Sequence, residues 1–184
     1  KSRQWVERIQ EQGTPVVYGI NTGFGSNAMV SITQGKLKEL QRNLIMSHAA
    51  GTGEALPIEV VRAAMLMRIN TFAKGYSGVR LELIDTLIQM LEKGVVPWIP
   101  EQGSLGASGD LAPLSHLGLV LSRGAKEDKE HHSGLAYFFN KQKQQWELTS
   151  GNEEMQQIMA EEFRDNGGRL VCRCQEGIKK VSLD

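Results

Sequence analysis

Residues 103–113 of the chain read GSLGASGDLAP and place the small residues Ala107-Ser108-Gly109 between two apolar segments. In a tightly bent chain, a backbone amide nitrogen can attack the carbonyl carbon two residues upstream. The attacking residue must then lack a Cβ, as Gly109 does, and the carbonyl must belong to a small residue, as at Ala107. Loss of water from the ring and from the Ser108 side chain would leave a methylidene group, an electrophile that no ordinary side chain provides. The stretch therefore indicates a strained loop that builds its own electrophile.

Other interpretations of the glycine-rich stretches fit the residues less fully. Ser108 does not lie in a G-x-S-x-G nucleophile elbow, because Asp110 stands where the last glycine is needed. A second stretch, GINTGFG at residues 19–25, lacks the G-x-G-x-x-G spacing, and neither stretch ends in the G-K-[ST] of a phosphate-binding loop. A purely structural role, in which the glycines provide positive φ at tight turns, stays open on the residues alone.

Helical segments must position these loops. Apolar residues recur at helical spacing in four segments, which are residues 36–50, 57–74, 79–93 and 111–122. We therefore expect a mainly α, multihelical domain.

Residues at the ends of these segments are typical of helix boundaries. Thr33 and Asp110 are expected N-caps, Pro57 suits a first helical position, and Gly94 suits the residue after a helix. Pro97 and Pro100 are expected to exclude regular structure from the connection between the third and fourth helices.

Composition narrows the class of protein. The chain has 184 residues, of which 40% are hydrophobic, and its formal net charge is zero, so we expect a globular domain with no nucleic-acid partner. No apolar run approaches a membrane span, and the polar N-terminus does not resemble a signal peptide. Since the chain does not begin with Met, we expect a trimmed or partial chain. The two cysteines form neither a disulfide framework nor a zinc site, which indicates a cytoplasmic protein without a metal.

The amino-acid composition changes near residue 125, so we divide the chain into residues 1–124 and a divergent tail at 125–184. The tail is polar and rich in glutamine. It contains an expected amphipathic helix at residues 153–163 and an expected short strand within 169–184. Its His131-His132 pair has no further ligand at metal-binding spacing and is expected on the surface.

Several long motifs together resemble one known family. The segment GSLGASGDLAPLSHLGLVL closely resembles the signature of the aromatic amino acid lyases, and YGINTGFGSNA resembles the tyrosine loop of that family. NLIMSHAAGTG and RINTFAKGYSGVR also resemble family segments, in the family order. The resemblance covers about residues 5–123. The segment around His48 is most similar to the histidine ammonia-lyases.

This resemblance implies a fold, a prosthetic group and a reaction. The fold would be the N-terminal domain of the lyase type, in truncated form. Ala107-Ser108-Gly109 would cyclise autocatalytically into 4-methylidene-imidazol-5-one (MIO), with Asp110 assisting or capping the next helix. The amine of an aromatic amino acid would add to the methylidene carbon, a base would remove a β-proton, and ammonia would leave. Histidine catabolism, with urocanate as product, is the implied activity.

The resemblance also assigns roles to single residues. Tyr18 matches the catalytic tyrosine of the family, and a phenol needs positive charge or hydrogen bonds nearby to act as a base at neutral pH. His48 matches a histidine that contacts the imidazole of the substrate, although its position on an apolar helix face alone would indicate a core residue. Asn21 and Gly25 are expected to line the pocket.

Three further polar residues in family-like segments are not given a catalytic role. His116 is expected to be structural. Arg68 and Asn70 lie in a predicted helix and have equal claims to structural and functional roles. No arginine stands in a motif that would bind the substrate carboxylate.

The chain also departs from the family, which leaves alternatives open. Family enzymes are much longer, and their active sites form between several subunits of a tetramer, so we expect a homo-oligomer. Besides an ammonia-lyase or a shortened form of one, the sequence allows a non-catalytic binding or interaction module, or an MIO-dependent aminomutase that returns ammonia to the neighbouring carbon.

Overall fold

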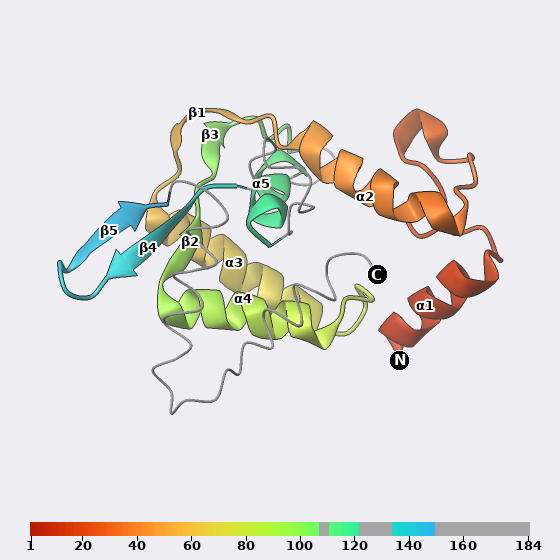
Figure 1. The fold of residues 1–184 in the computed structure, drawn as a ribbon, viewed down its shortest axis with the longest axis horizontal. Coiled ribbons are helices and arrows are strands. Elements are labelled where there is room, and N and C mark those ends of the chain that lie inside the picture. Colours follow the sequence, from red (N-terminus) through yellow and green to blue (C-terminus); the bar gives the residue numbers. More distant parts are fainter. Residues whose placement is uncertain (107–110, 122–133, 150–184) are drawn as a thin grey trace.

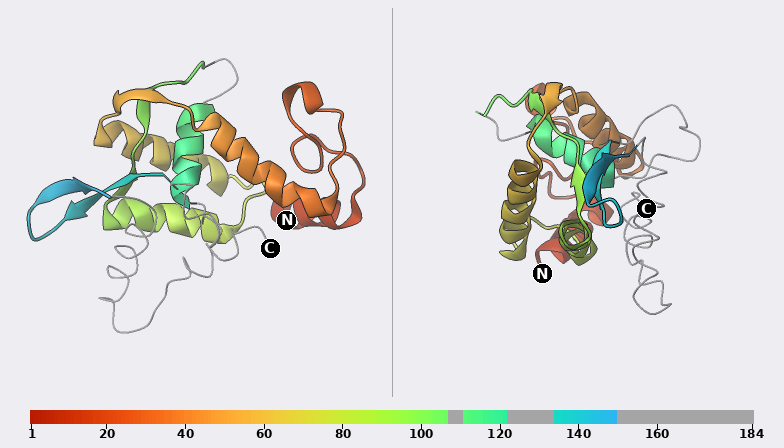
Figure 2. Two further views of the ribbon diagram at one scale, coloured as in Figure 1. Left: turned by 45° about the horizontal axis from the view of Figure 1, so that its top comes forward. Right: turned by 90° about the vertical axis from the view of Figure 1, so that its left-hand side faces the viewer.

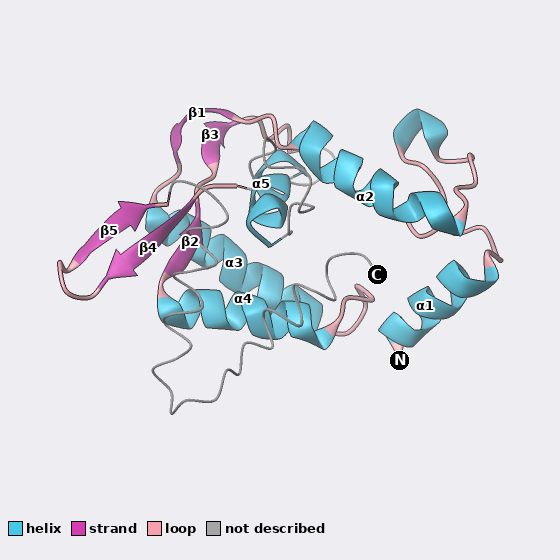
Figure 3. Ribbon diagram, viewed as in Figure 1, coloured by secondary structure: helices cyan, strands magenta, loops and turns pink. Residues whose placement is uncertain are grey.

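The computed structural model describes residues 1–106, 111–121 and 134–149, and this part of the chain is mainly helical (Figures 1 and 3). The predicted fold class is therefore confirmed. The helices are α1 (Ser2–Gln12), a 3-10 turn (Gly25–Asn27), α2 (Gln34–His48), α3 (Ile58–Ala73), α4 (Leu81–Lys93) and α5 (Leu111–Leu121). The strands are β1 (Thr52–Ala55), β2 (Val95–Pro97), β3 (Pro100–Gln102), β4 (Ala136–Asn140) and β5 (Gln145–Leu148).

The core lies where α3, α4, α5 and β2 meet. α3 and α4 pack side by side, α2 packs on α5, and β2 contacts α3, α4 and α5 (Figures 1 and 2). The core is made of aliphatic and methionine side chains, including Val61, Met65, Leu87, Met90, Val96, Leu117 and Val120. Burial of these apolar side chains stabilises the body that carries the loops.

All four predicted helices form, and a fifth appears at the N-terminus. α4 shows the expected C-terminal stop, because Gly94 has a φ of 70° and donates its N–H to the carbonyl of Met90. The residue at the N-cap of α2 is Thr33, as expected, although its side chain makes no capping hydrogen bond. Pro57 is the N-cap of α3 rather than its first helical residue, since its ψ of 138° is extended. α1 arises from the polar amphipathic pattern of the first residues.

The expectation that Pro97 and Pro100 exclude regular structure is wrong. β2 ends at Pro97 and β3 begins at Pro100, so each proline lies at a strand end, where a missing N–H costs least. β2 pairs antiparallel with β4, and β4 with β5; β1 pairs antiparallel with β3. These strands have three to five residues each and add small sheets to the helical body.

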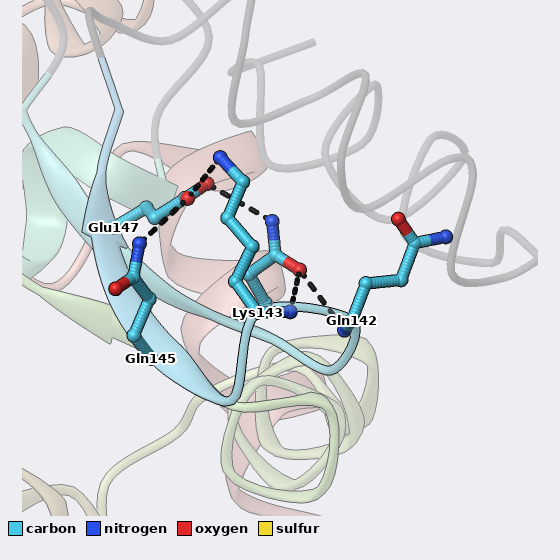
Figure 4. Close-up of polar contacts among 5 residues, drawn as sticks. Gln142, Lys143, Gln145 and Glu147 are labelled. Carbon is cyan, nitrogen blue, oxygen red and sulfur yellow. Dashed lines mark hydrogen bonds and ion pairs between the residues drawn. The ribbon is translucent and has the colours of Figure 1, made fainter.

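A tight turn joins β4 to β5, and polar side chains organise it (Figure 4). The Oδ1 atom of Asn140 accepts the N–H groups of Gln142 and Lys143 at 3.0 and 3.1 Å. Its Nδ2 atom donates to Glu147 Oε2 at 3.1 Å. Lys143 Nζ donates to Glu147 Oε1 at 2.7 Å, and Gln145 Nε2 donates to the same oxygen at 3.3 Å. Asparagine side chains commonly stabilise such turns by bonding backbone N–H groups two residues on.

The division of the chain at residue 124 stays a prediction, because that position lies outside the described residues. On its far side, β4 pairs with β2, so residues 136–140 pack with the N-terminal body. The expected helix at 153–163, the expected strand within 169–184 and the His131-His132 pair also fall outside the described residues.

Candidate active site

The tyrosine loop connects α1 to α2 and is organised by one buried amide. Asn21 is only 3% exposed. Its Oδ1 accepts the N–H of Val17 at 2.7 Å, and its Nδ2 donates to the carbonyls of Gly13 and Pro15, both at 3.1 Å. The side chain of Asn21 therefore holds the loop together, and its predicted place in the pocket wall stays a prediction.

Tyr18 lies at the outside of this loop. Its side chain is 61% exposed, and its ring meets the ring of Phe24 edge-on with centroids 5.8 Å apart. Gly25 begins the 3-10 turn with a φ of 56°, which favours glycine. The phenol of Tyr18 is thus exposed on the surface of the described part of the chain.

His48 is the last residue of α2. Its Nδ1 lies 2.8 Å from the carbonyl oxygen of Leu44 and 3.0 Å from Ser47 Oγ. Because a carbonyl oxygen only accepts, the neutral imidazole carries its proton on Nδ1 and donates it to Leu44. The Nε2 atom is then a hydrogen-bond acceptor.

The residues predicted to form the electrophile, Ala107, Ser108 and Gly109, lie outside the described residues, as does Asp110. The segments on either side of them are described. β3 precedes them and pairs with β1 at Thr52↔Gln102, and α5 follows them. Residues 103–106 project from the end of this strand pair, and Leu105 is 93% exposed (Figure 2, left).

Gly51 lies between β3 and α5, the segments before and after residues 103–110, which we call the two stems. A Cβ at Gly51 would lie 3.0 Å from the carbonyl oxygen of Gln102 and 3.1 Å from Nε2 of His116. A Cβ at Gly103 would lie 3.0 Å from the Cα of Gly51. Gly51 therefore approaches both stems at distances that leave no room for a Cβ, and Gly103 approaches Gly51 equally closely.

The tyrosine loop and His48 lie at opposite ends of α2. The tyrosine loop lies at the N-terminal end of α2, whereas β1, β3 and α5 lie at its C-terminal end, next to His48 (Figure 1). At about 1.5 Å of rise per residue, the 15 residues of α2 span roughly 22 Å. A single chain therefore does not bring Tyr18 to His48.

The remaining polar residues singled out from the sequence lie on α3 and α5. Arg68 stacks over the ring of Phe72, 5.7 Å from its centroid, and Asn70 is exposed. His116 is buried and accepts the N–H of Gly51 at 3.2 Å. The contact joins residues 65 positions apart, so no local signal in the sequence could reveal it.

A cavity of about 930 Å³ lies elsewhere, between α1, the end of α3 and the start of α4. Charged residues line it, among them Arg3, Glu7, Arg80 and Glu82. Burial lowers the pKa of Arg80, and the positive charge of Arg3 lowers it further. None of the predicted site residues lines this cavity, so it is separate from the candidate site.

The described residues contain neither a membrane-spanning helix nor a metal-binding cluster. None of the helices in residues 1–106 and 111–121 combines the length and apolar character needed to cross a bilayer. Over the same part of the chain and the β4–β5 hairpin, no three side chains of the His, Cys, Asp and Glu types gather to hold a metal ion.

Comparison with known proteins defines the class. A model of the aromatic amino acid lyase family matches residues 1–152, which extends past the division at residue 124. The chain belongs to the aromatic amino acid lyase family.

Its similar relatives include histidine ammonia-lyases, which are carbon–nitrogen lyases. The histidine ammonia-lyase of Caldanaerobacter subterraneus subsp. tengcongensis is 59% identical over 120 residues, which cover 65% of this chain and 23% of that protein. The histidine ammonia-lyase of Alkaliphilus metalliredigens is 45% identical over 192 residues, covering 99% of this chain and 36% of that protein. The chain thus spans well under half of the length of these relatives.

Solved structures share the fold. An ergothionase from Treponema denticola superposes with a TM-score of 0.70 and 29% identity, over 85% of this chain and 28% of that one. This enzyme is named for the degradation of ergothioneine and not of histidine, so the shared fold alone does not define the substrate.

Proposed function

We propose that this chain supplies the electrophile segment and the tyrosine loop of a histidine ammonia-lyase, which converts histidine to urocanate and ammonia. The observation that carries the proposal is that His48 lies three residues before Gly51, which contacts both stems of the Ala107-Ser108-Gly109 segment, in a chain whose relatives include histidine ammonia-lyases.

The electrophile would form from the chain itself. The Gly109 nitrogen bonds to the carbonyl carbon of Ala107, and the carbonyl oxygen leaves as water with the protons of the Gly109 and Ser108 amides. The Ser108 hydroxyl then leaves as a second water with the Ser108 α-proton, so the step is balanced and redox-neutral. The missing Cβ atoms at Gly51 and Gly103 fit this chemistry, because they let the stems close on each other. The finished MIO group supplies a carbon electrophile for the substrate amine.

The other residues would bind the substrate and move a proton. The Nε2 atom of His48 accepts a hydrogen bond, which suits the N–H of an imidazole and does not suit a phenyl ring. Tyr18 would take the β-proton of the substrate. Since the tyrosine loop and His48 lie at opposite ends of α2, the tyrosine that completes a site comes from another copy of the chain.

An exposed apolar face supports this assembly. Val60, Leu66 and Met67 lie on one side of α3 and are 50%, 59% and 63% exposed. Large exposed apolar side chains gathered on one face are typical of an interaction surface. We therefore propose a homo-oligomer, and we expect a single copy to have little or no lyase activity.

Intact mass tests the proposed electrophile. The purified chain should be lighter than its sequence by two waters, and the loss should map to the peptide that contains Ala107 to Gly109. Ser108→Ala cannot lose the second water, and Gly109→Ala should lose neither. A mass equal to that of the sequence would favour the non-catalytic module.

Assays of the same sample separate the enzyme candidates. Release of urocanate from histidine, in preference to the turnover of phenylalanine or tyrosine, supports the lyase. A β-amino acid product would indicate the aminomutase instead. His48→Leu should weaken histidine turnover more than turnover of an apolar aromatic substrate.

A further inference from the structure

His116 occupies the second turn of α5, directly after the segment that would carry the electrophile. Its side chain is 9% exposed, and its ring meets the ring of Trp98 edge-on, with centroids 6.3 Å apart. Nε2 of His116 accepts the backbone N–H of Gly51 at 3.2 Å. A buried ring is thus fixed by one aromatic neighbour and one hydrogen bond.

This hydrogen bond defines the protonation state of His116. A backbone N–H only donates, so Nε2 must be unprotonated and the ring must be neutral with its proton on Nδ1. A protonated ring would direct an N–H at the N–H of Gly51, and the hydrogen bond would be lost. Burial also lowers the pKa of His116, which favours the same neutral form.

The partner of His116 joins the two stems of the loop. Gly51 bonds to His116 on α5, after the loop, and the next residue, Thr52, pairs with Gln102 on β3, before the loop. Both stems of residues 103–110 are therefore attached to two consecutive residues, Gly51 and Thr52. Removal of either attachment would let the stems separate.

We propose that His116 is a positioning residue: by accepting the N–H of Gly51 it holds α5 to the strand pair β1–β3, so the two described segments that flank Ala107-Ser108-Gly109 stay together, and loss of this hydrogen bond slows the cyclisation proposed for that segment. The same contact anchors the chain three residues after His48, so it also sets where His48 stands relative to the loop. This inference rests on the proposed function. It gives a positioning task to a histidine that the sequence analysis expected to be structural.

Other ionisable groups near α5 also contribute to the pH dependence of the hydrogen bond between Gly51 and His116. β2 and the described part of α5 carry no ionisable side chain besides His116, and Asp110 precedes α5 in the sequence. The ionisable residues on the other neighbouring elements are Lys36, Lys38, Glu39, Arg42 and His48 on α2, Glu54 on β1 and Glu101 on β3. Burial is the cause of the lowered pKa of His116, so its own protonation should dominate the acid side of the profile.

The test compares two replacements of His116 in the 184-residue chain. His116→Gln keeps an acceptor near the position of Nε2, whereas His116→Phe keeps the ring beside Trp98 and removes the acceptor. Ser115→Ala, on the same helix, is the matched control. Each chain is refolded at mildly alkaline to mildly acidic pH, and the loss of two waters is followed by intact mass. Amide hydrogen exchange at Gly51 is measured on the same samples.

We expect His116→Phe to lose water about tenfold more slowly than the unsubstituted chain, the size of effect that one lost hydrogen bond gives. His116→Gln and Ser115→Ala should stay close to the unsubstituted rate. The unsubstituted rate and the protection of the Gly51 amide should fall together as the pH drops below 6.5, the ordinary pKa of histidine. His116→Gln should show no such fall.

Four results would overturn the inference. Equal rates in the unsubstituted chain and His116→Phe would remove the role of His116 and leave the proposed function standing. Equally slow loss in His116→Phe and His116→Gln would show that the acceptor is not what matters. If His116→Phe does not fold, the pH profiles of the unsubstituted chain and His116→Gln decide, and identical profiles contradict the inference. Absence of mass loss in the unsubstituted chain would instead overturn the proposed function, and the inference with it.

Discussion

The side-chain oxygen of Asn21 accepts the backbone N–H of Val17 at 2.7 Å, and the two residues enclose Tyr18 within one turn of the tyrosine loop. The same amide donates to two carbonyls of residues 13–15. The exposed phenol therefore stands on a loop in which one buried amide side chain bonds three backbone groups. Such a side chain keeps the loop in one shape although few apolar contacts support it.

Asn21→Ala should destabilise the chain. The substitution leaves the N–H of Val17 and the carbonyls of Gly13 and Pro15 without their partner, so the free energy of unfolding should fall by about 1–3 kcal/mol in urea titrations. Asn27→Ala changes an exposed amide of the neighbouring 3-10 turn and should stay within about 0.5 kcal/mol. Equal losses in both variants would contradict the role given to Asn21.

Gly51→Ala should destabilise the chain and slow the loss of water. Its Cβ would meet the Gln102 oxygen and Pro100 Cγ at 3.0 Å, which are parts of a paired strand that cannot easily move. Overpacking of this kind typically costs about 1–3 kcal/mol of unfolding free energy. Gly35→Ala is the matched control, because a Cβ at this exposed position of α2 meets nothing within 4 Å. It should stabilise the helix by about 0.5–1 kcal/mol. Calorimetric unfolding of both variants checks the opposite signs.

The β4–β5 turn should respond to acid through Glu147. The hydrogen bond from Lys143, followed by those from Asn140 and Gln145, lowers the pKa of Glu147 below 4.5. A lowered carboxyl pKa contributes stability that is complete above pH 4.5 and is lost as the pH falls through the folded value. The carboxyl carbon resonance of Glu147 should titrate at a lower pH than that of a free glutamate. Lys143→Met should move this midpoint upward, whereas Lys74→Met, with the same change of charge at the end of α3, should not.

Leu66→Lys should weaken self-association. The side chain lies on the exposed apolar side of α3, and a charge buried in an apolar contact is costly unless it is paired. Sedimentation velocity should show a smaller average species than the unsubstituted chain at equal concentration. Asn43→Lys, which adds the same charge at an exposed polar position of α2, is the control. An identical distribution for Leu66→Lys and the unsubstituted chain would place the interface elsewhere.

Local features were predictable from the sequence, and the contacts between distant residues were not. The amphipathic spacing of residues 81–93 and the stop at Gly94 reflect interactions within about one helical turn, so the pattern of α4 shows in the sequence. β2 has three residues and depends on a partner, with Val95 opposite Phe138, so short-range patterns could not reveal it. Pro97 led us to expect an irregular connection. A proline disrupts the interior of a strand but is tolerated at its end, and the sequence alone does not show which of these positions Pro97 takes.

The same division holds at the candidate site. The types of the site residues, from Tyr18 and His48 to Ala107-Ser108-Gly109, came from motifs and their resemblance to a family. The placement of the tyrosine loop and His48 at opposite ends of α2 could not be predicted, because it depends on the direction in which the loop leaves the helix. His116 was expected to be structural. The group that it bonds, the N–H of Gly51, is 65 positions away and can be identified only in the folded chain.

The placement of the tyrosine loop and the electrophile stems at opposite ends of α2 has a genetic consequence. Under the proposed assembly, each site draws its phenol from one copy and its electrophile from another. Two inactive alleles, one carrying Tyr18→Phe and the other Ser108→Ala, would then complement each other in a cell that expresses both. Mixed oligomers would contain some sites built only from intact parts, while other sites would collect both defects.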